Sequence, residues 1–304
     1  MKKIIAFLTV LAFTVTVRAQ ETTSRTNDFV TFDQIEASGD FEIMYYVSDR
    51  YRVDWTFDTV LGSLVEVTVK NGILYLTFNE KGMSSELKKT YKGRNARRPL
   101  LRATVYAPRI STVTLADNAA FNGAGEVVET GFFRLNMSGK AQFKNMKIHT
   151  EKFSLEATRD ARADLQVTAS QIDIQADKAA IVNLSQESDE LSIHTAGTSS
   201  ITVTGKTTDL LTSAQNSSKI TLSGTVDSVR HDGKGSSEMD LLGAPMTAAE
   251  AVMSGPCKLY LSVSDLLKVD LKSGSAVYYE GDPRIEVVGI ASSSLLHYDG
   301  KKKK

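Results

Sequence analysis

The main pattern in this chain is a recurrence of apolar, strand-like segments at intervals of about 19 residues. The most regular of these segments begin at Phe153, Ile172, Leu191, Leu210 and Val229. The series continues at slightly altered spacing with segments that begin at Ala249, Leu267 and Ile285. A unit this short does not bury its own apolar face and has to stack on its neighbours, as the repeats of a solenoid do. The spacing therefore predicts a shape before it predicts any chemistry.

Within one repeat, apolar and polar positions alternate in two short runs. In the repeat that begins at Leu191, odd positions are apolar or small, and Ser192 and His194 lie between them. Because successive side chains of a strand point to opposite faces, we expect the odd positions inside and the even positions in solvent. The alternation resumes at Ile201 and Val203. Each repeat is therefore expected to contain a strand, a corner, a second strand and a turn.

Two further columns of the repeat are expected to fix the corner. Position 7 is often Gly or Asn, residues that tolerate the positive φ of a sharp bend; examples are Gly197, Asn216, Gly235 and Gly255. Position 9 is small throughout and includes Ala180, Ser199, Ser218, Ser237, Cys257 and Ser275. Cys257 is the only cysteine of the chain, which excludes an intramolecular disulfide. Its place in this column predicts a buried structural thiol and not a nucleophile.

These columns predict an all-β protein: a parallel β-solenoid, similar to a single-stranded β-helix, with about ten rungs. At about 4.8 Å per rung the stack would be very roughly 50 Å long. An antiparallel sandwich also alternates with period 2. We favour the solenoid because a sandwich does not require the same residue type in the same column of every unit.

The region before the regular repeats has a different pattern. Residues 64–70 and 73–78 alternate on either side of Asn71-Gly72, which predicts an antiparallel hairpin inserted near the N-terminus. A long polar stretch, 79–99, follows the hairpin and is expected to be a loop. We expect an N-terminal β region at 32–109, with a first rung, the hairpin and this basic loop. The solenoid repeats are then expected at 110–300.

The first 19 residues have the composition of a secretory signal peptide. They contain two lysines, an apolar run from Ile4 to Val17, and Val17-Arg18-Ala19 as a cleavage site. The run is too short to span the roughly 30 Å hydrocarbon layer of a membrane. We therefore expect an exported chain without a transmembrane segment, located in the periplasm, on the outer-membrane surface or outside the cell. Residues 20–31 are expected to be a linker and 301–304 a basic tail.

Charge supplies one local candidate site. The chain has 36 basic and 36 acidic residues, so no global field recruits nucleic acid or an anionic membrane. The polar stretch after the hairpin is basic, however, and its candidate binding residues are Lys88, Lys89, Lys92, Arg94, Arg97 and Arg98. Such a cluster suits an acidic glycan or another anionic envelope component. The alternative is a solvated loop without a ligand. Nucleic acid is disfavoured because Tyr91 is the one aromatic residue within the run.

No catalytic or metal site emerges from the sequence. A polysaccharide lyase or hydrolase on a β-helix needs clustered carboxylates, and the outward acids appear at different rung positions. The four histidines occupy separate rungs without a common column: His149, His194, His231 and His297. His231 falls on an inward column and is expected to be a satisfied core residue. We expect neither a cofactor nor a metal.

Several phrases of the sequence resemble a known family. The Ser-Gly corners of IEASGDFEI, NMSGKAQF and VMSGPCKLYL, the segment LRATVYAPRISTVTL and the closing SGSAVYYEGDP are similar to the auto-transporter adhesin family called the head GIN domain. The resemblance covers Phe32 to the C-terminus. It implies an exported envelope protein of the Bacteroidota with a parallel β-solenoid and an adhesive role, without catalytic residues. The chain departs from the pattern at Arg159 and Lys178, where a corner glycine is usual.

Two tripeptides, Asp58-Thr59-Val60 and Asp227-Ser228-Val229, match a short acceptor pattern for O-glycosylation of exported proteins of that phylum. Thr59 and Ser228 are therefore candidate modification sites.

Together these features predict a non-enzymatic, exported binding module that presents a ribbed β-solenoid surface to glycan or another envelope partner. A carbohydrate-active enzyme and a purely structural envelope spacer remain the alternatives. A homo-oligomer is a further expectation, because the last strand of an open stack can template another chain. Lys301 to Lys304 would discourage such growth by repulsion.

Overall fold

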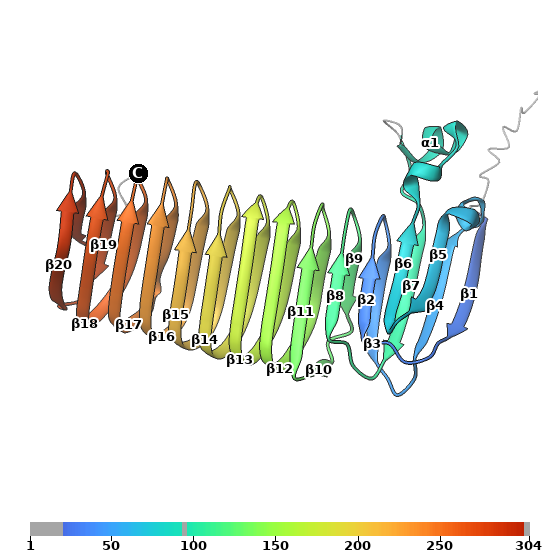
Figure 1. The fold of residues 1–304 in the computed structure, drawn as a ribbon, viewed down its shortest axis with the longest axis horizontal. Coiled ribbons are helices and arrows are strands. Elements are labelled where there is room, and N and C mark those ends of the chain that lie inside the picture. Colours follow the sequence, from blue (N-terminus) through green and yellow to red (C-terminus); the bar gives the residue numbers. More distant parts are fainter. Residues whose placement is uncertain (1–20, 93–95, 301–304) are drawn as a thin grey trace, which may run out of the picture.

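The computed structural model describes residues 21–92 and 96–300. Over these ranges the chain forms one elongated stack of β-strands, with the N-terminal region at one end and the last repeats at the other (Figure 1). The expected parallel β-solenoid is confirmed, with about ten turns. Consecutive long strands pair in parallel, which excludes the antiparallel sandwich. The expected signal peptide at 1–19, the tail at 301–304 and Arg94 lie outside the described residues.

Seven long strands form the regular part of the stack. Each crosses one face of the solenoid, bends, and continues across the other face (Figure 1). They are β12 (Gln142–Arg159), β13 (Arg162–Lys178), β14 (Ile181–Thr195), β15 (Ser200–Ala214), β16 (Lys219–Lys234), β17 (Glu238–Ser254) and β18 (Lys258–Lys272).

Shorter strands build the two ends. The N-terminal strands are β1 (Thr22–Asp28), β2 (Gln34–Ala37), β3 (Glu42–Val47), β4 (Arg52–Asp58), β5 (Val65–Lys70), β6 (Ile73–Phe78), β7 (Leu101–Ala107), β8 (Thr112–Leu115), β9 (Ala120–Gly123), β10 (Val127–Glu129) and β11 (Phe132–Met137). The C-terminal strands are β19 (Ala276–Glu280), β20 (Arg284–Ala291) and β21 (Ser294–His297). Three short helices lie near the N-terminal end: η1 (Thr59–Leu64), η2 (Glu80–Gly82) and α1 (Ser85–Lys92).

The strand register confirms the columns of the repeat. Leu191 pairs with Ile172 on one side and with Leu210 on the other, 19 residues away in each direction. All three side chains are at most 2% exposed. Equivalent positions therefore stack directly above one another, and the apolar columns form the core.

An odd repeat length requires one break in the alternation of each long strand. In β14 the break consists of Asp189 and Glu190, two consecutive exposed residues. The sequence predicted a separate turn at this point, whereas the structure has a continuous strand that bends. Because the ladder resumes one residue later, the bend adds an outward residue without ending the sheet.

The corners keep their geometry where the repeat lacks glycine. Gly197 has φ 71°, and Arg159 and Lys178 both have φ 66°. These two residues occupy the left-handed region at a cost of about 1–2 kcal/mol each, a cost that glycine does not have. Arg159 and Lys178 therefore replace the usual glycine, and the corner keeps the same backbone conformation.

Position 9 is an interior column, as expected. Ser199 is buried, and its hydroxyl oxygen lies 2.7 Å from the carbonyl oxygen of Ala196, to which it donates, and 3.2 Å from that of Ala176. Cys257 is 0% exposed, and its thiol lies 3.5 Å from the Gly233 carbonyl oxygen. Burial raises the pKa of the Cys257 thiol above its usual value, which keeps it protonated. The cysteine is therefore a packing residue of this column.

The N-terminal region extends both faces of the stack with antiparallel strands. On one face, β1 pairs with β4 and β4 with β7, before β7 joins β3 in parallel. On the other, the expected hairpin at Asn71-Gly72 is confirmed: β5 and β6 are antiparallel, and β6 joins β2 in parallel. Residues 20–31, expected to be a linker, include β1. Alternation did not reveal this strand because all of its side chains are polar.

The polar stretch at 79–99 also differs from the loop that the sequence predicted. It contains η2 and α1, and α1 projects from the side of the stack (Figure 1). Tyr91 of α1 is buried, and Leu87 one turn earlier packs against the core. These two apolar residues, four positions apart, hold the helix on the sheet.

Candidate functional site

A long groove of about 780 Å³ runs along the repeats on one side of the solenoid. Its apolar lining consists of first positions of successive repeats, which are at most 4% exposed: Ile172, Leu191, Leu210, Val229 and Ala249. Two outward columns form its sides. One column carries Gln171, Glu190, Asp209 and Ser228, and the other carries Asp173, Ser192, Leu211, Arg230, Glu250 and Lys268.

The polar side chains of the groove are connected from rung to rung. The Gln171 amide donates to Glu190 at 2.8 Å, and the Ser228 hydroxyl donates to Asp209 at 2.6 Å. On the second column, Lys268 of one rung pairs with Glu250 of the neighbouring rung at 3.1 Å. These bonds hold carboxylates at the spacing of the rungs, about 4.8 Å. The groove thus presents a row of hydrogen-bond acceptors beside an apolar strip.

Sequence reasoning missed this groove. The repeat pattern predicts outward acids at different rung positions, without a common column. The register shows that Gln171, Glu190 and Asp209 occupy one column, because each pairs with the next across a rung. Counting back one position from each repeat start identifies this column in the sequence.

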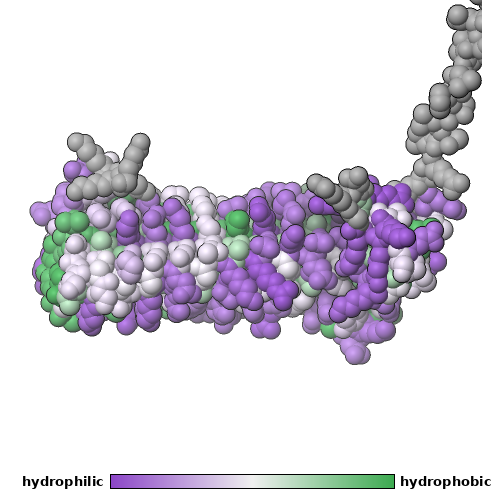
Figure 2. All heavy atoms as spheres, turned by 90° about the horizontal axis from the view of Figure 1, so that it is seen from above, coloured by the Kyte–Doolittle hydropathy of each residue, from purple (hydrophilic) through white to green (hydrophobic). Residues whose placement is uncertain are grey.

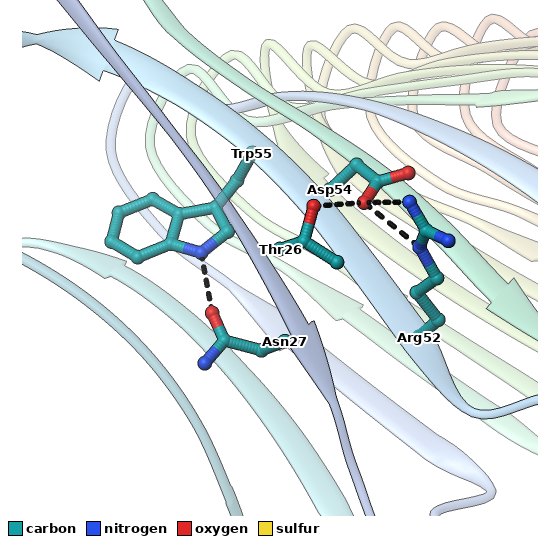
Figure 3. A network of polar contacts seen from close by, with 5 residues as sticks. All are labelled: Thr26, Asn27, Arg52, Asp54 and Trp55. Atoms are coloured by element: carbon teal, nitrogen blue, oxygen red, sulfur yellow. Dashed lines mark hydrogen bonds and ion pairs between the residues drawn. The ribbon is translucent and has the colours of Figure 1, made fainter.

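A second polar surface lies on the outer face of the N-terminal sheet (Figure 3). The Asp54 carboxylate accepts from Thr26 at 2.7 Å and from the Arg52 guanidinium, which lies 2.8–2.9 Å away. Beside this network Tyr46 stacks on Tyr106 with ring centroids 5.5 Å apart. A hollow of about 410 Å³ lies next to Arg52 and Tyr106. A fixed guanidinium and an aromatic pair provide a small contact surface for a polar ligand.

The predicted basic residues divide into paired and unpaired groups. Lys92 pairs with Glu80 at 2.7 Å. Arg97 donates to the Tyr91 hydroxyl at 2.8 Å, and its guanidinium lies 5.0 Å from the Tyr91 ring centre. Lys88, Lys89 and Arg98 are exposed. The structure therefore leaves three described cations of the candidate site directed to solvent.

Arg97 belongs to a junction between α1 and the sheet. Asp58 is 0% exposed, and its carboxylate accepts from the Tyr91 hydroxyl at 3.0 Å and from the Leu100 backbone N–H at 3.1 Å. Burial raises the pKa of Tyr91 above its usual value. The phenol therefore stays protonated and donates to Asp58, which anchors the helix.

The two candidate glycosylation sites occupy different settings. Thr59 begins η1, and its hydroxyl lies 3.0 Å from the Thr23 hydroxyl; the preceding Asp58 is buried. Ser228 lies in β16 at the groove, where it donates to Asp209. Both side chains are half-buried. Modification at either position therefore remains a prediction.

The histidines do not converge. His231 is buried and lies 2.8 Å from the Thr212 hydroxyl through Nδ1, whereas His194 is exposed. Within residues 21–92 and 96–300, no group of three or more His, Cys, Asp or Glu side chains is arranged to hold a metal ion. Over the same described ranges, no helix has the length and apolarity required to cross a membrane.

The fold and the groove define the class of the protein as an elongated β-solenoid with an exposed polar groove along its repeats. The chain belongs to the family described as "putative auto-transporter adhesin, head GIN domain", which it matches over residues 31–201 and 173–283. The match is consistent with the resemblance seen in the Ser-Gly corners of the sequence.

Solved structures share this fold. A protein described as a putative adhesin from Parabacteroides merdae is similar with a TM-score of 0.55 and 15% identity, covering 92% of this chain and 97% of that chain. A second putative adhesin, from Parabacteroides distasonis, has a TM-score of 0.52 and 16% identity over 91% and 97% of the two chains. No curated protein matches the chain. At these identities the similarity concerns the fold alone.

Proposed function

We propose that this protein is an exported, non-enzymatic adhesin whose ligand is a linear glycan lying in the groove, parallel to the solenoid axis. The groove itself carries the proposal. It continues across the repeats, with an apolar lining and a column of acceptor side chains on four successive rungs, Gln171, Glu190, Asp209 and Ser228. Membership of the adhesin family supports the adhesive role.

A polysaccharide fits the repeating geometry of the groove. Sugar rings have apolar C–H faces and a perimeter of hydroxyl donors, so one ligand satisfies both the apolar strip and the carboxylates. Leu211 lines the groove with 47% of its surface exposed, and Glu190 and Asp209 line the opposite column. A chain of similar sugar units therefore meets similar contacts on successive rungs.

The proposal is non-enzymatic because the groove carboxylates are bonded to their neighbours. Glu190 accepts a hydrogen bond from Gln171, and Asp209 accepts one from Ser228, so both carboxylates are held along one column of the groove. A glycosidase requires one carboxylic acid with a raised pKa opposite a second carboxylate. The groove acids instead form a ladder of acceptors, which suits binding.

The direct test measures glycan binding and turnover with the same protein. The mature chain is applied to a glycan array, and the dissociation constant of the strongest linear glycan is measured by calorimetry. Glu190→Gln combined with Asp209→Asn is expected to weaken binding by about tenfold to 100-fold through loss of two charged acceptors. Asp164→Asn, an exposed acid of β13 outside the groove, is the matched control.

Two outcomes would contradict the proposal. Equal binding by the groove variant and the control would remove the groove as the site. Release of reducing ends or unsaturated sugars from the bound glycan would make the protein an enzyme, and absence of both binding and turnover would favour the envelope spacer. Detection of the chain only in the cytoplasmic fraction would contradict export.

The basic segment supports a second candidate, contact with an acidic polysaccharide. Lys88, Lys89 and Arg98 are exposed, whereas Lys92 is already paired with Glu80. Replacing the three exposed cations by alanine is expected to abolish salt-sensitive retention on an acidic polysaccharide column. Lys92→Ala is the control with a smaller effect. Unchanged retention of the triple variant would show that the basic segment is a solvated surface without a ligand.

A further inference from the structure

At the C-terminal end of the solenoid, β21 covers β19, whereas β20 leaves apolar side chains uncovered. β20 pairs with β18 on one side and, within the described residues, with no strand on the other. Four of its apolar side chains are exposed by 39–64%: Ile285, Val287, Val288 and Ile290. Figure 2 shows hydrophobic residues gathered at this end of the rod.

Three of these residues, Ile285, Val287 and Ile290, lie on inward columns of the stack, and Val288 is the extra residue at a break in the register. Ile285 pairs with Leu267, and Val287 pairs with Val269. Leu267 and Val269 are 0% exposed because β20 covers them. The side chains on the same columns of β20 would be covered in the same way by one further rung. The unpaired N–H and C=O groups of β20 require a partner of the same kind, since an uncovered strand edge is a template for another strand.

On one face, the opposite end of the rod is formed by β1, whose side chains are polar. β1 carries seven polar residues, and its Arg25 guanidinium lies 5.4 Å from both the Trp55 and Phe57 ring centres. The Trp55 indole N–H donates to Asn27 at 2.8 Å (Figure 3). An apolar rung placed against this end would desolvate Arg25 and Asn27 without replacing their partners. Head-to-tail stacking is therefore unfavourable.

We propose that the C-terminal end is a dimer interface in which a second copy of this chain supplies the missing rung. A two-fold axis perpendicular to the rod reverses the strand direction, so the two β20 strands meet antiparallel. A register centred between Val287 and Val288 places Ile285 opposite Ile290 of the second copy. Apolar side chains then face apolar side chains, and the backbone groups of both edges are paired.

Charge and closure also favour this arrangement. Within each β20, Arg284 pairs with Glu286 at 3.1 Å, so the edge does not bring an uncompensated charge to the interface. Two-fold pairing uses both open ends, and the polar β1 ends point outward. The interface continues the rung-to-rung contact of the chain itself and ends growth at two copies. The proposed glycan groove reaches β20 at Glu286, whereas the interface uses the open edge of the same strand.

Sedimentation of the mature chain over a range of protein concentrations tests the proposal. The native chain is expected to be dimeric at about 0.15 M salt, where charges more than about 8 Å apart are largely screened. Val288→Lys buries an unpaired charge at the interface and is expected to raise the dimer dissociation constant by about 100-fold or more. Val252→Lys is the matched control, because Val252 is 38% exposed on β17, which β18 separates from β20.

Circular dichroism confirms that both lysine variants are folded, since each change is at an exposed position. A monomeric native chain, an equal effect of both lysine variants, or oligomers larger than dimers would each overturn the proposal. A spin label on Asp282→Cys, an exposed residue just before β20, then reports the geometry, because the native Cys257 is buried. A short label-to-label distance is expected, and a distance of two rod lengths would contradict the tail-to-tail contact.

Discussion

His231 is a histidine in the core of the solenoid. It is fully buried, hydrogen-bonded to Thr212, and its Nε2 would lie 2.8 Å from a Cβ added at Gly233. Burial lowers the pKa of this histidine from 6.5 to about 4, although Asp232 opposes the shift. The imidazole is therefore neutral in the folded protein at neutral pH. Protonation of the buried ring would lower the stability of the fold.

Because of His231, the free energy of unfolding should decrease as the pH is lowered. The unfolded chain binds a proton near pH 6.5, and the folded chain binds it only near pH 4. This contribution is fully present above pH 6.5 and is lost as the pH falls through that window, by about 2 kcal/mol between pH 7 and pH 5. Urea denaturation at both pH values should show a shallower pH dependence for His231→Gln. The exposed His194→Gln serves as the control, and equal slopes for the two variants would contradict the assignment.

Gly224 is a second residue with a strict requirement. Its φ is 131°, and an added Cβ would overlap the carbonyl oxygen of Gly205 on the rung below. Gly224→Ala should lower the free energy of unfolding by at least about 3 kcal/mol, through backbone strain and loss of close stacking. Chemical denaturation would detect this change. Gly131→Ala, whose Cβ meets open space, should alter stability by less than about 1 kcal/mol.

At the scale of elements, α1 depends on its buried anchor. Tyr91→Phe removes one of the two donors to the Asp58 carboxylate and should destabilise the fold by about 1–3 kcal/mol. Tyr75→Phe, on the half-buried β6 strand, is the matched change and should have a smaller effect. Thermal unfolding of the two variants compares them directly. Equal melting temperatures would indicate that α1 is held by apolar contacts alone.

The elements that the sequence predicted are those whose side chains carry the period. The register of Ile172, Leu191 and Leu210 and the hairpin at Asn71-Gly72 follow from alternation and turn chemistry. Alternation did not reveal β1, because its strand is specified by pairing with β4 and by the contacts of Arg25 with Trp55. The sequence did not predict α1, because its apolar pair, Leu87 and Tyr91, lies among charged residues. The sequence did not predict the groove, because the groove depends on the bend in each long strand. Only the observed strand register places Glu190 beside Asp209.

At the scale of the whole molecule, the rungs should be removable as units. Deletion of Leu191–Asp209, 19 residues, joins Glu190 to Leu210 and lets Leu210 occupy the place of Leu191 against Ile172. The shortened chain should fold with reduced stability, because a solenoid is held by contacts between neighbouring rungs. Small-angle scattering should show a rod shorter by about 4.8 Å.

A deletion that ignores the period is the control for this design. Removing 191–200 shifts the register and moves outward residues to the inside, so this variant should lose its β-sheet circular dichroism. A folded product would show that the columns do not specify the stack.

The parallel register also determines how the chain acquires its structure. Each repeat finds its partner 19 residues earlier, so a strand emerging during synthesis meets an edge that is already formed. The closed N-terminal end supplies the first such edge, and each loop to be closed is equally short. The molecule is therefore suited to vectorial folding, in which growth of the stack follows the direction of translation and the unfinished edge is always the newest.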